Sequence, residues 1–149
     1  MIDLEPLLLR LPLDEPVYFT ATTEPVNTLP VALVGVTAGE QTAYGEALVA
    51  DPAVLVAAVD FFADTVANSR PDAYGLIYQR LCALMQEYDP QPHADYASVL
   101  SALDVALWDL AARELNVPCW RLLGGARTRL VDLAVGGLAV TDPALEDRA

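Results

Sequence analysis

Two stripes of apolar residues in the middle of the chain predict helices. The first stripe consists of Leu55, Val59, Phe62 and Val66. Its spacing is that of one helix face, and Asp51 and Pro52 precede it as an N-cap and a first helical residue. The second stripe, which predicts a helix over residues 72–88, consists of Ile77, Leu81, Leu84 and Tyr88.

The longest predicted helix lies within residues 98–125, SVLSALDVALWDLAARELNVPCWRLLGG. Its Ala, Leu, Arg and Glu residues favour a helix, while Pro118 and the pair Gly124 and Gly125 predict a break and then a short helical turn. Apolar residues, Trp108 among them, cover most of the helix circumference. We therefore expect this helix to be buried on most sides.

Two aspartates on this helix have predicted structural roles. Asp104 lies inside the apolar stripe, so it is expected to be buried and to accept hydrogen bonds from backbone N–H groups or an arginine. Asp109 and Arg113 share the one polar arc, four residues apart, which favours an ion pair. Because Asp104 and Asp109 point about 140° apart on a helix, they cannot act as acid and base on one substrate atom.

Three antiparallel strands are predicted before the helices. Residues 2–13 are rich in leucine and contain Pro6 and Pro12, which predicts an edge strand that proline interrupts. Residues 14–30 carry three prolines and, among others, the threonines Thr20, Thr22 and Thr23, and predict a long loop. Residues 31–36 and 43–47 predict a hairpin. A sheet followed by a bundle of helices is an α+β fold.

The pattern changes after Gly125. Residues 130–140, LVDLAVGGLAV, form a mostly apolar run that is typical of a strand buried on both faces. Asp142 and Pro143 then repeat the N-cap signal, which predicts the start of another helix. The sequence offers this last strand no neighbouring strand with which to pair.

Composition limits the possible chemistry and partners. The chain has 149 residues, enough for one ordinary domain, and 21 acidic against 8 basic residues give a formal net charge of −13. This charge argues against nucleic acid or an anionic membrane as a partner. All 8 basic residues are arginine, which excludes lysine Schiff-base chemistry and a P-loop. The single histidine, His93, is expected in an exposed loop and excludes a His-rich metal site.

Cysteines, apolar runs and the amino terminus suggest the compartment. Cys82 and Cys119 match no metal or redox spacing and are expected to be buried, reduced thiols. No apolar run approaches the roughly 18 residues of a membrane-spanning helix. The amino terminus is acidic where a signal peptide is basic. We therefore expect a cytoplasmic protein without a membrane segment.

An ordered series of motifs resembles a known family. The segment LSALDVALWDLAARELNVPCWRLLGG resembles the end of the amino-terminal capping domain of the mandelate racemase and muconate lactonizing enzyme family, in the enolase superfamily. RLPLDEP, VGVTAGEQTAYGEA and the helix start at Asp51 and Pro52 agree with the same domain. Ala43 stands where the family usually has glycine, and the hairpin turn is one residue longer, so the register of the third strand stays open.

The resemblance implies a cap domain over residues 1–125 and the start of a truncated (β/α) barrel over residues 126–149. In the family the barrel supplies the acid and base residues and the carboxylates that hold Mg²⁺, which stabilises the enolate formed when a proton leaves the carbon next to a substrate carboxylate. Such enzymes are racemases, cycloisomerases or dehydratases. The resemblance therefore assigns no catalytic residue, metal ligand or bound cofactor to this chain, and it implies that the chain alone is inactive.

The resemblance also implies two loops that close over the substrate and exclude water. The candidate residues for substrate contact in these loops are Tyr18, Phe19, Thr20, Thr22 and Glu46. Each of them could instead be a loop side chain that touches no substrate. The residues expected to have structural roles are Asp104, Trp108, Asp109, Arg113, Gly124 and Gly125.

Two interpretations of what the chain associates with remain open. The cap face and the segment 130–140 are expected to expose apolar surface, which favours contact with the missing barrel or association into a homo-oligomer. The alternative is a stand-alone binding or oligomerisation module that keeps the cap fold without a barrel. Whether the natural reading frame continues past Ala149 into a Lys-x-Lys strand would distinguish the two.

Overall fold

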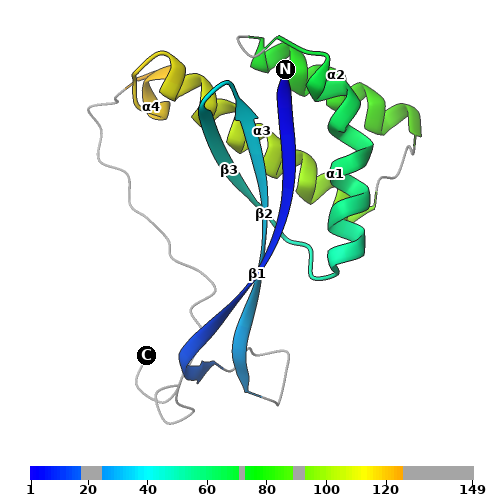
Figure 1. Ribbon diagram of the computed structural model, residues 1–149, viewed down its shortest axis with the longest axis vertical. Coiled ribbons are helices and arrows are strands. Elements are labelled where there is room, and N and C mark those ends of the chain that lie inside the picture. The colour runs from blue at the N-terminus through cyan, green and yellow to red at the C-terminus, as the bar shows by residue number, and fades with distance from the viewer. Residues whose placement is uncertain (18–24, 71–72, 89–92, 126–149) are drawn as a thin grey trace. The chain divides into compact units, whose positions relative to one another are not determined.

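The computed structural model describes residues 1–17, 25–70, 73–88 and 93–125 (Figure 1). Four of the five candidate contact residues, Tyr18, Phe19, Thr20 and Thr22, lie outside these ranges, as does the segment 130–140. The chain divides into two compact units. One consists of Met1–Leu9 with Val31–Ala126, and the other of Arg10–Pro30 with Arg127–Ala149.

The described strands form one sheet in the order β1-β2-β3, with β1 at Ile2–Val17, β2 at Val26–Ala38 and β3 at Gln41–Ala47. β2 and β3 are antiparallel, with Val36 opposite Ala43 and Ala38 opposite Gln41. Only Gly39 and Glu40 lie between the last pair, and Gly39 has a φ of 62°, as the first residue of a II′ hairpin turn requires. This pairing settles the register that the sequence left open.

β1 and β2 are longer than the sequence predicts. The predicted interruption of the first strand is wrong, because β1 continues to Val17. The predicted loop over residues 14–30 is wrong at both ends, since β2 already begins at Val26, and its middle, residues 18–24, lies outside the described residues. Neighbouring residues of a strand direct their N–H groups to opposite edges, and β1 has an outer edge. Pro6, Pro12 and Pro16 all stand at even positions, so their missing N–H groups can all fall on that outer edge.

Four helices follow the sheet: α1 at Pro52–Ala67, α2 at Tyr74–Tyr88, α3 at Ala94–Glu114 and α4 at Cys119–Leu122. The predicted cap of α1 is confirmed, since the Asp51 side chain accepts a hydrogen bond of 2.8 Å from the Ala53 N–H. α2 starts two residues later than predicted and α3 four residues earlier, with His93 as its exposed N-cap residue. The predicted break and short turn after α3 are confirmed by α4.

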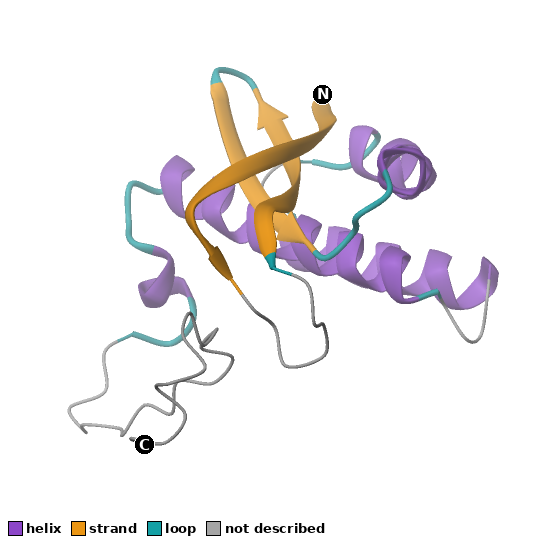
Figure 2. Cartoon of the chain, turned by 90° about the horizontal axis from the view of Figure 1, so that it is seen from below, coloured by secondary structure: helices purple, strands orange, loops and turns teal. Residues whose placement is uncertain are grey.

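The core lies between one face of the sheet and the helices, with α3 crossing the sheet (Figure 2). All four residues of the first predicted stripe are buried: Leu55, Val59, Phe62 and Val66. In the second stripe Ile77 and Leu81 are buried, but Tyr88 is 72% exposed. Its ring instead lies 4.9 Å from that of Phe61, between ring centroids, at the rim of the core. These contacts confirm the predicted α+β architecture.

Candidate functional site

The end of β3 carries Glu46, the one candidate substrate-contact residue that the structure describes. We call residues 46–49 the lid segment. Glu46 lies on β3 opposite Leu33 and is exposed, and Leu48 is 90% exposed. The alternate residues Ala47 and Val49 are buried. This alternation directs the Glu46 carboxylate and the Leu48 side chain to solvent while their neighbours hold the segment to the core.

Two contacts with α3 fix the lid segment. Gly45 lies against the backbone of Ala102, so closely that a Cβ at this position would be 2.6 Å from the Ala102 carbonyl carbon. One helical turn earlier, the Ser98 hydroxyl accepts a hydrogen bond of 2.6 Å from the Leu48 N–H. Ser98 is not among the residues predicted from the sequence. Ser98 lies four residues before Ala102, so the two residues share one helix face. This spacing is the sequence signal that could have identified Ser98.

Tyr44 lies beside Glu46 on the outward face of β3, because the two residues are two positions apart in one strand. Tyr44 is 48% exposed, and its ring lies over Gly35 of β2, where an added Cβ would be 3.2 Å from the ring. A carboxylate, a phenol and the leucine of the lid segment thus stand on a rigid support. The phenol and the carboxylate can bind a polar ligand through hydrogen bonds, and the carboxylate can accept them from hydroxyl groups.

Asp104 is half-buried rather than buried, which corrects the sequence prediction. Its hydrogen-bonding partner is the Trp108 side chain, one turn further along α3, in place of the predicted backbone groups or arginine. Burial raises the pKa of the Asp104 carboxyl, and the Trp108 hydrogen bond offsets part of this effect. The aspartate fits within an apolar stripe because the indole N–H next to it satisfies one oxygen while another side of the carboxylate reaches water.

Residues of α2 face this part of α3. The Trp108 ring lies 5.5 Å from that of Tyr74, between centroids. The pKa of Tyr78 is raised, chiefly by its hydrogen bond with Cys82, then by the charge interaction with Cys82 and by burial, and least by the charge of Asp104. Cys82 and Cys119 are both free thiols and are partly rather than fully buried. The group connects the two helices.

The predicted ion pair on α3 is confirmed. The Arg113 Nε and Nη2 atoms lie 2.9 and 2.7 Å from the same carboxylate oxygen of Asp109. Both side chains are well exposed, and the pairing with Asp109 raises the pKa of Arg113. The pair therefore lies on the solvent side of α3, consistent with a structural role.

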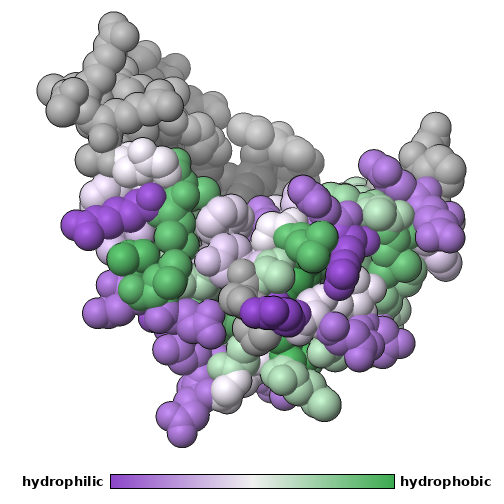
Figure 3. All heavy atoms as spheres, turned by 90° about the horizontal axis from the view of Figure 1, so that it is seen from above, coloured by the Kyte–Doolittle hydropathy of each residue, from purple (hydrophilic) through white to green (hydrophobic). Residues whose placement is uncertain are grey.

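Apolar side chains reach the surface at the end of α3 and on α4. Leu115, Trp120 and Leu123 are 57%, 49% and 66% exposed. The Arg121 guanidinium carbon lies 5.4 Å from the centroid of the Trp120 ring. Gly124 and Gly125 follow with φ angles of 107° and 78°, which other residues rarely adopt. On the face seen in Figure 3, apolar side chains likewise come to the surface among polar ones.

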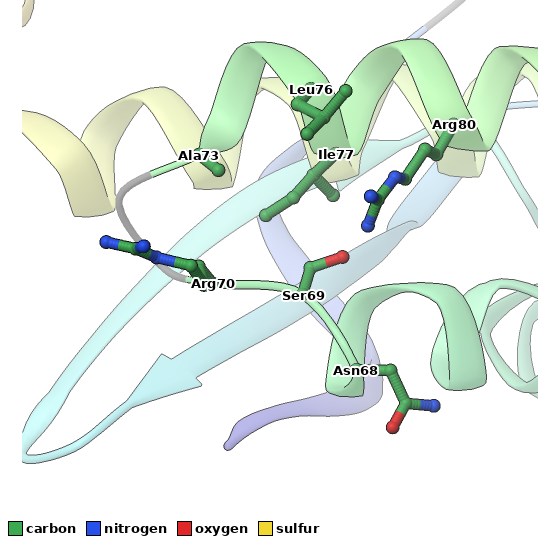
Figure 4. Close-up of a pocket in the computed structure, with 7 residues that line it drawn as sticks. All are labelled: Asn68, Ser69, Arg70, Ala73, Leu76, Ile77 and Arg80. Atoms are coloured by element: carbon green, nitrogen blue, oxygen red, sulfur yellow. The ribbon is translucent and has the colours of Figure 1, made fainter.

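A hollow of about 220 Å³ lies between the end of α1 and the start of α2 (Figure 4). Its lining includes two arginines, Arg70 and Arg80, and an apolar side formed by Leu76 and Ile77. The Arg80 side chain extends towards Ser69, whose hydroxyl donates to the Thr65 carbonyl oxygen at 2.6 Å. The whole of α1, about 24 Å long at 1.5 Å per residue, separates this hollow from the lid segment.

The described residues do not fit a metal site. Over residues 1–17, 25–70, 73–88 and 93–125, no three or more His, Cys, Asp or Glu side chains are grouped so that they could hold an ion. In the same ranges, no helix has both the length and the apolar character needed to cross a membrane. The described residues of the candidate site can thus bind a polar ligand through the exposed Glu46 and Tyr44 side chains.

Comparisons with known proteins show which family the chain matches. Residues 10–124 match the family model of the mandelate racemase / muconate lactonizing enzyme, N-terminal domain. A stretch of 29 residues is 66% identical to a D-gluconate dehydratase of Thermoproteus tenax, covering 20% of this chain and 6% of the dehydratase.

Several solved structures are similar to this protein over most of the chain. The 3,6-anhydro-D-galactonate cycloisomerase of Zobellia galactanivorans is 26% identical with a TM-score of 0.63, covering 83% of this chain and 32% of the cycloisomerase. A racemase of Streptomyces coelicolor A3(2) with bound magnesium is 21% identical with a TM-score of 0.70, covering 85% and 36%, a likeness that shows the fold alone. The chain thus spans about a third of the length of these structures.

Proposed function

Since the chain belongs to the mandelate racemase / muconate lactonizing enzyme N-terminal domain family of the enolase superfamily, we propose that it is the capping domain of a Mg²⁺-dependent enzyme. The proposed reaction is removal of a proton from the carbon next to the carboxylate of an acid sugar, leading to dehydration, racemisation or cycloisomerisation. The observation that carries the proposal is the family match over residues 10–124. The names of the dehydratase and the cycloisomerase favour acid sugars as the substrate class.

The role of this chain in such an enzyme is to select and enclose the substrate. The first lid loop would contain Tyr18, Phe19, Thr20 and Thr22. In the second, the exposed Glu46 carboxylate would accept hydrogen bonds from substrate hydroxyls, and Leu48 would help to exclude water. Because Gly45 and Ser98 fix this segment to α3, Glu46 stands on a preorganised support rather than on a free loop.

The chemical step would take place in a barrel domain outside the described residues. Mg²⁺ would supply stabilisation of the enolate there. The described residues offer no group that fits the ion, so we assign no step of the reaction to them. It follows that residues 1–149 alone are expected to be inactive.

The test has two parts. The 149-residue chain is incubated in D₂O with Mg²⁺ and D-gluconate or related acid sugars, and deuterium incorporation is followed by NMR; measurable exchange would overturn the proposed inactivity. The coding sequence is also read past Ala149. A frame that continues into a Lys-x-Lys strand supports the proposal, and in that longer protein Glu46→Gln should raise KM for the acid sugar more than it lowers kcat.

A second function is favoured by the exposed apolar side chains of Leu115, Trp120 and Leu123. Such surface is also what a binding or oligomerisation module without a barrel would need. On either proposal the chain associates through this surface, with a barrel or with another copy. Light scattering of the wild-type chain and of Trp120→Ser tests this: a homo-oligomer that dissociates in the variant supports self-association, and a wild-type monomer rejects it.

A further inference from the structure

The hollow between α1 and α2 is lined by positive charge. Two of the eight arginines of the chain, Arg70 and Arg80, belong to its lining, and the described lining residues include no acidic one. This local excess runs against the overall balance, since the chain has 21 acidic residues and a net charge of −13. Guanidinium groups bind carboxylates well, because each presents a fork of N–H donors. The hollow therefore has the charge that an anion requires.

The two arginines are not needed to cap the end of α1. The Asn68 side chain and backbone N–H both donate to the Asp64 carbonyl oxygen, at 2.9 and 3.2 Å. The Ser69 hydroxyl donates to the Thr65 carbonyl oxygen, and the Ser69 N–H donates to that of Val66 at 3.0 Å. These carbonyl groups of the last turn already have donors, so the guanidinium groups are left for another role.

Arg80 is placed to receive a ligand. Its side chain is exposed and extends from α2 towards Ser69 (Figure 4). Among the residues that the structure describes, none forms a hydrogen bond or ion pair with the Arg80 guanidinium. Arg70 already has an interaction of its own. Arg80 is therefore the residue expected to bind the anion, and Arg70 adds a second positive charge.

The size and the apolar side of the hollow favour a small organic anion. Its volume of about 220 Å³ is below the range of about 300 to 1,000 Å³ that is typical of pockets for drug-sized ligands. Leu76 and Ile77 form an apolar wall that can contact a short carbon chain. Arg70 follows α1 whereas Arg80 lies on α2, so the two charges enter from different elements. This arrangement suits a ligand with a negative group at each end.

We propose that the hollow binds a short dicarboxylate, with one carboxylate on Arg80, the other near Arg70 and the carbon chain against Leu76. The negative charge of the whole chain disfavours a large polyanion, whereas a small anion meets mainly the local field of the two arginines. The site is separate from the lid segment and does not depend on the proposed enzymatic function.

NMR titration of the 15N-labelled chain with succinate at constant ionic strength tests the site. We expect saturable shifts of the amide signals of Ser69 and Ile77, with a Kd of about 1 mM or tighter. Arg80→Gln should raise this Kd at least about tenfold, because the forked donor is lost. Arg121→Gln removes the same charge from α4 and should leave the Kd within about twofold of wild type. Unchanged signals from α3 in both variants confirm that the core remains folded.

Three outcomes would overturn the proposal. One is amide signals that do not shift, or that shift without saturating, in the wild-type chain. Another is an equal loss of affinity in Arg80→Gln and Arg121→Gln, because the attraction would then come from overall charge. The third is binding of inorganic phosphate as tight as that of succinate at the same ionic strength, because the apolar wall would then contribute nothing.

Discussion

The backbone of Gly45 lies directly against the backbone of Ala102, and no side chain separates the two. A Cβ on Gly45 would overlap the Ala102 carbonyl oxygen and lie 2.8 Å from the Ala102 Cα. This contact sets how closely β3 approaches α3. Since Glu46 is the next residue, it also sets the position from which the lid segment leaves the sheet.

Replacing Gly45 with alanine should therefore be costly. The added methyl group meets backbone rather than a movable side chain, so the helix or the strand must shift, at a cost of about 3 kcal/mol. Gly75→Ala is the matched control, because nothing lies within 4 Å of its Cβ position on α2. This control should be neutral or stabilise by up to about 1 kcal/mol. Thermal unfolding measures both, and equal Tm values for the two variants would contradict the close approach.

Ser98→Ala should loosen the lid segment. The variant leaves the Leu48 N–H without its acceptor, and we expect a loss of about 1 kcal/mol in unfolding free energy and faster exchange of the Leu48 amide. Ser101→Ala, at an exposed position of the same helix, is the control. If both variants left exchange at Leu48 unchanged, Ser98 would not hold the segment in solution.

Asp104→Asn should stabilise the fold at neutral pH. Burial raises the pKa of the Asp104 carboxyl above its ordinary value of 3.8, so the folded chain holds this proton more tightly than the unfolded chain does. The resulting stabilisation is complete below that ordinary value and is lost as the pH rises through the raised, folded pKa. Asparagine stays neutral and keeps an oxygen for the Trp108 N–H.

The Asp104→Asn advantage in Tm should thus be largest near pH 7 and shrink towards about pH 3. Tm measured against pH for both proteins checks this. A difference that does not vary with pH would show that the charge on Asp104 is not what costs stability. The half-buried position also lowers the expected cost of Asp104→Ala below the few kcal/mol that a fully buried aspartate would imply.

Asp51→Ala should weaken the start of α1. The variant removes the hydrogen bond to the Ala53 N–H, and the loss of an N-cap typically costs about 1 kcal/mol. Asp60→Ala, which removes the same charge from an exposed position in the middle of α1, should change the unfolding free energy by less than about 0.5 kcal/mol. Urea unfolding of the two variants measures the difference.

The helices could be predicted because their signals are local. Each signal depends on residues within a few positions of one another. Examples are the cap at Asp51, the stripe through Phe62 and the ion pair between Asp109 and Arg113. The strands were less predictable. Proline predicts an interruption of a strand unless the strand has a free edge, and the sequence does not show which edge of β1 is free. Only the sheet order shows that an outer edge is available to Pro12 and Pro16.

The candidate site depends on contacts between distant parts of the chain. Ser98 and Leu48 are 50 residues apart, and the approach of Gly45 to Ala102 depends on how the sheet packs on α3. The burial of Asp104 was overestimated because periodicity shows the direction of a side chain but not how far water reaches along it. The predicted contact roles of Tyr18 and Glu46 stay predictions.

The prolines of β1 also determine where the sheet could grow. Because proline has no backbone N–H, Pro6, Pro12 and Pro16 make β1 a poor template for a strand from another molecule. β3 forms the other edge among the described strands, and Gln41–Ala47 contains no proline. Aggregation of concentrated protein by strand addition would therefore start at β3, and a single proline at an exposed position there should slow fibril formation.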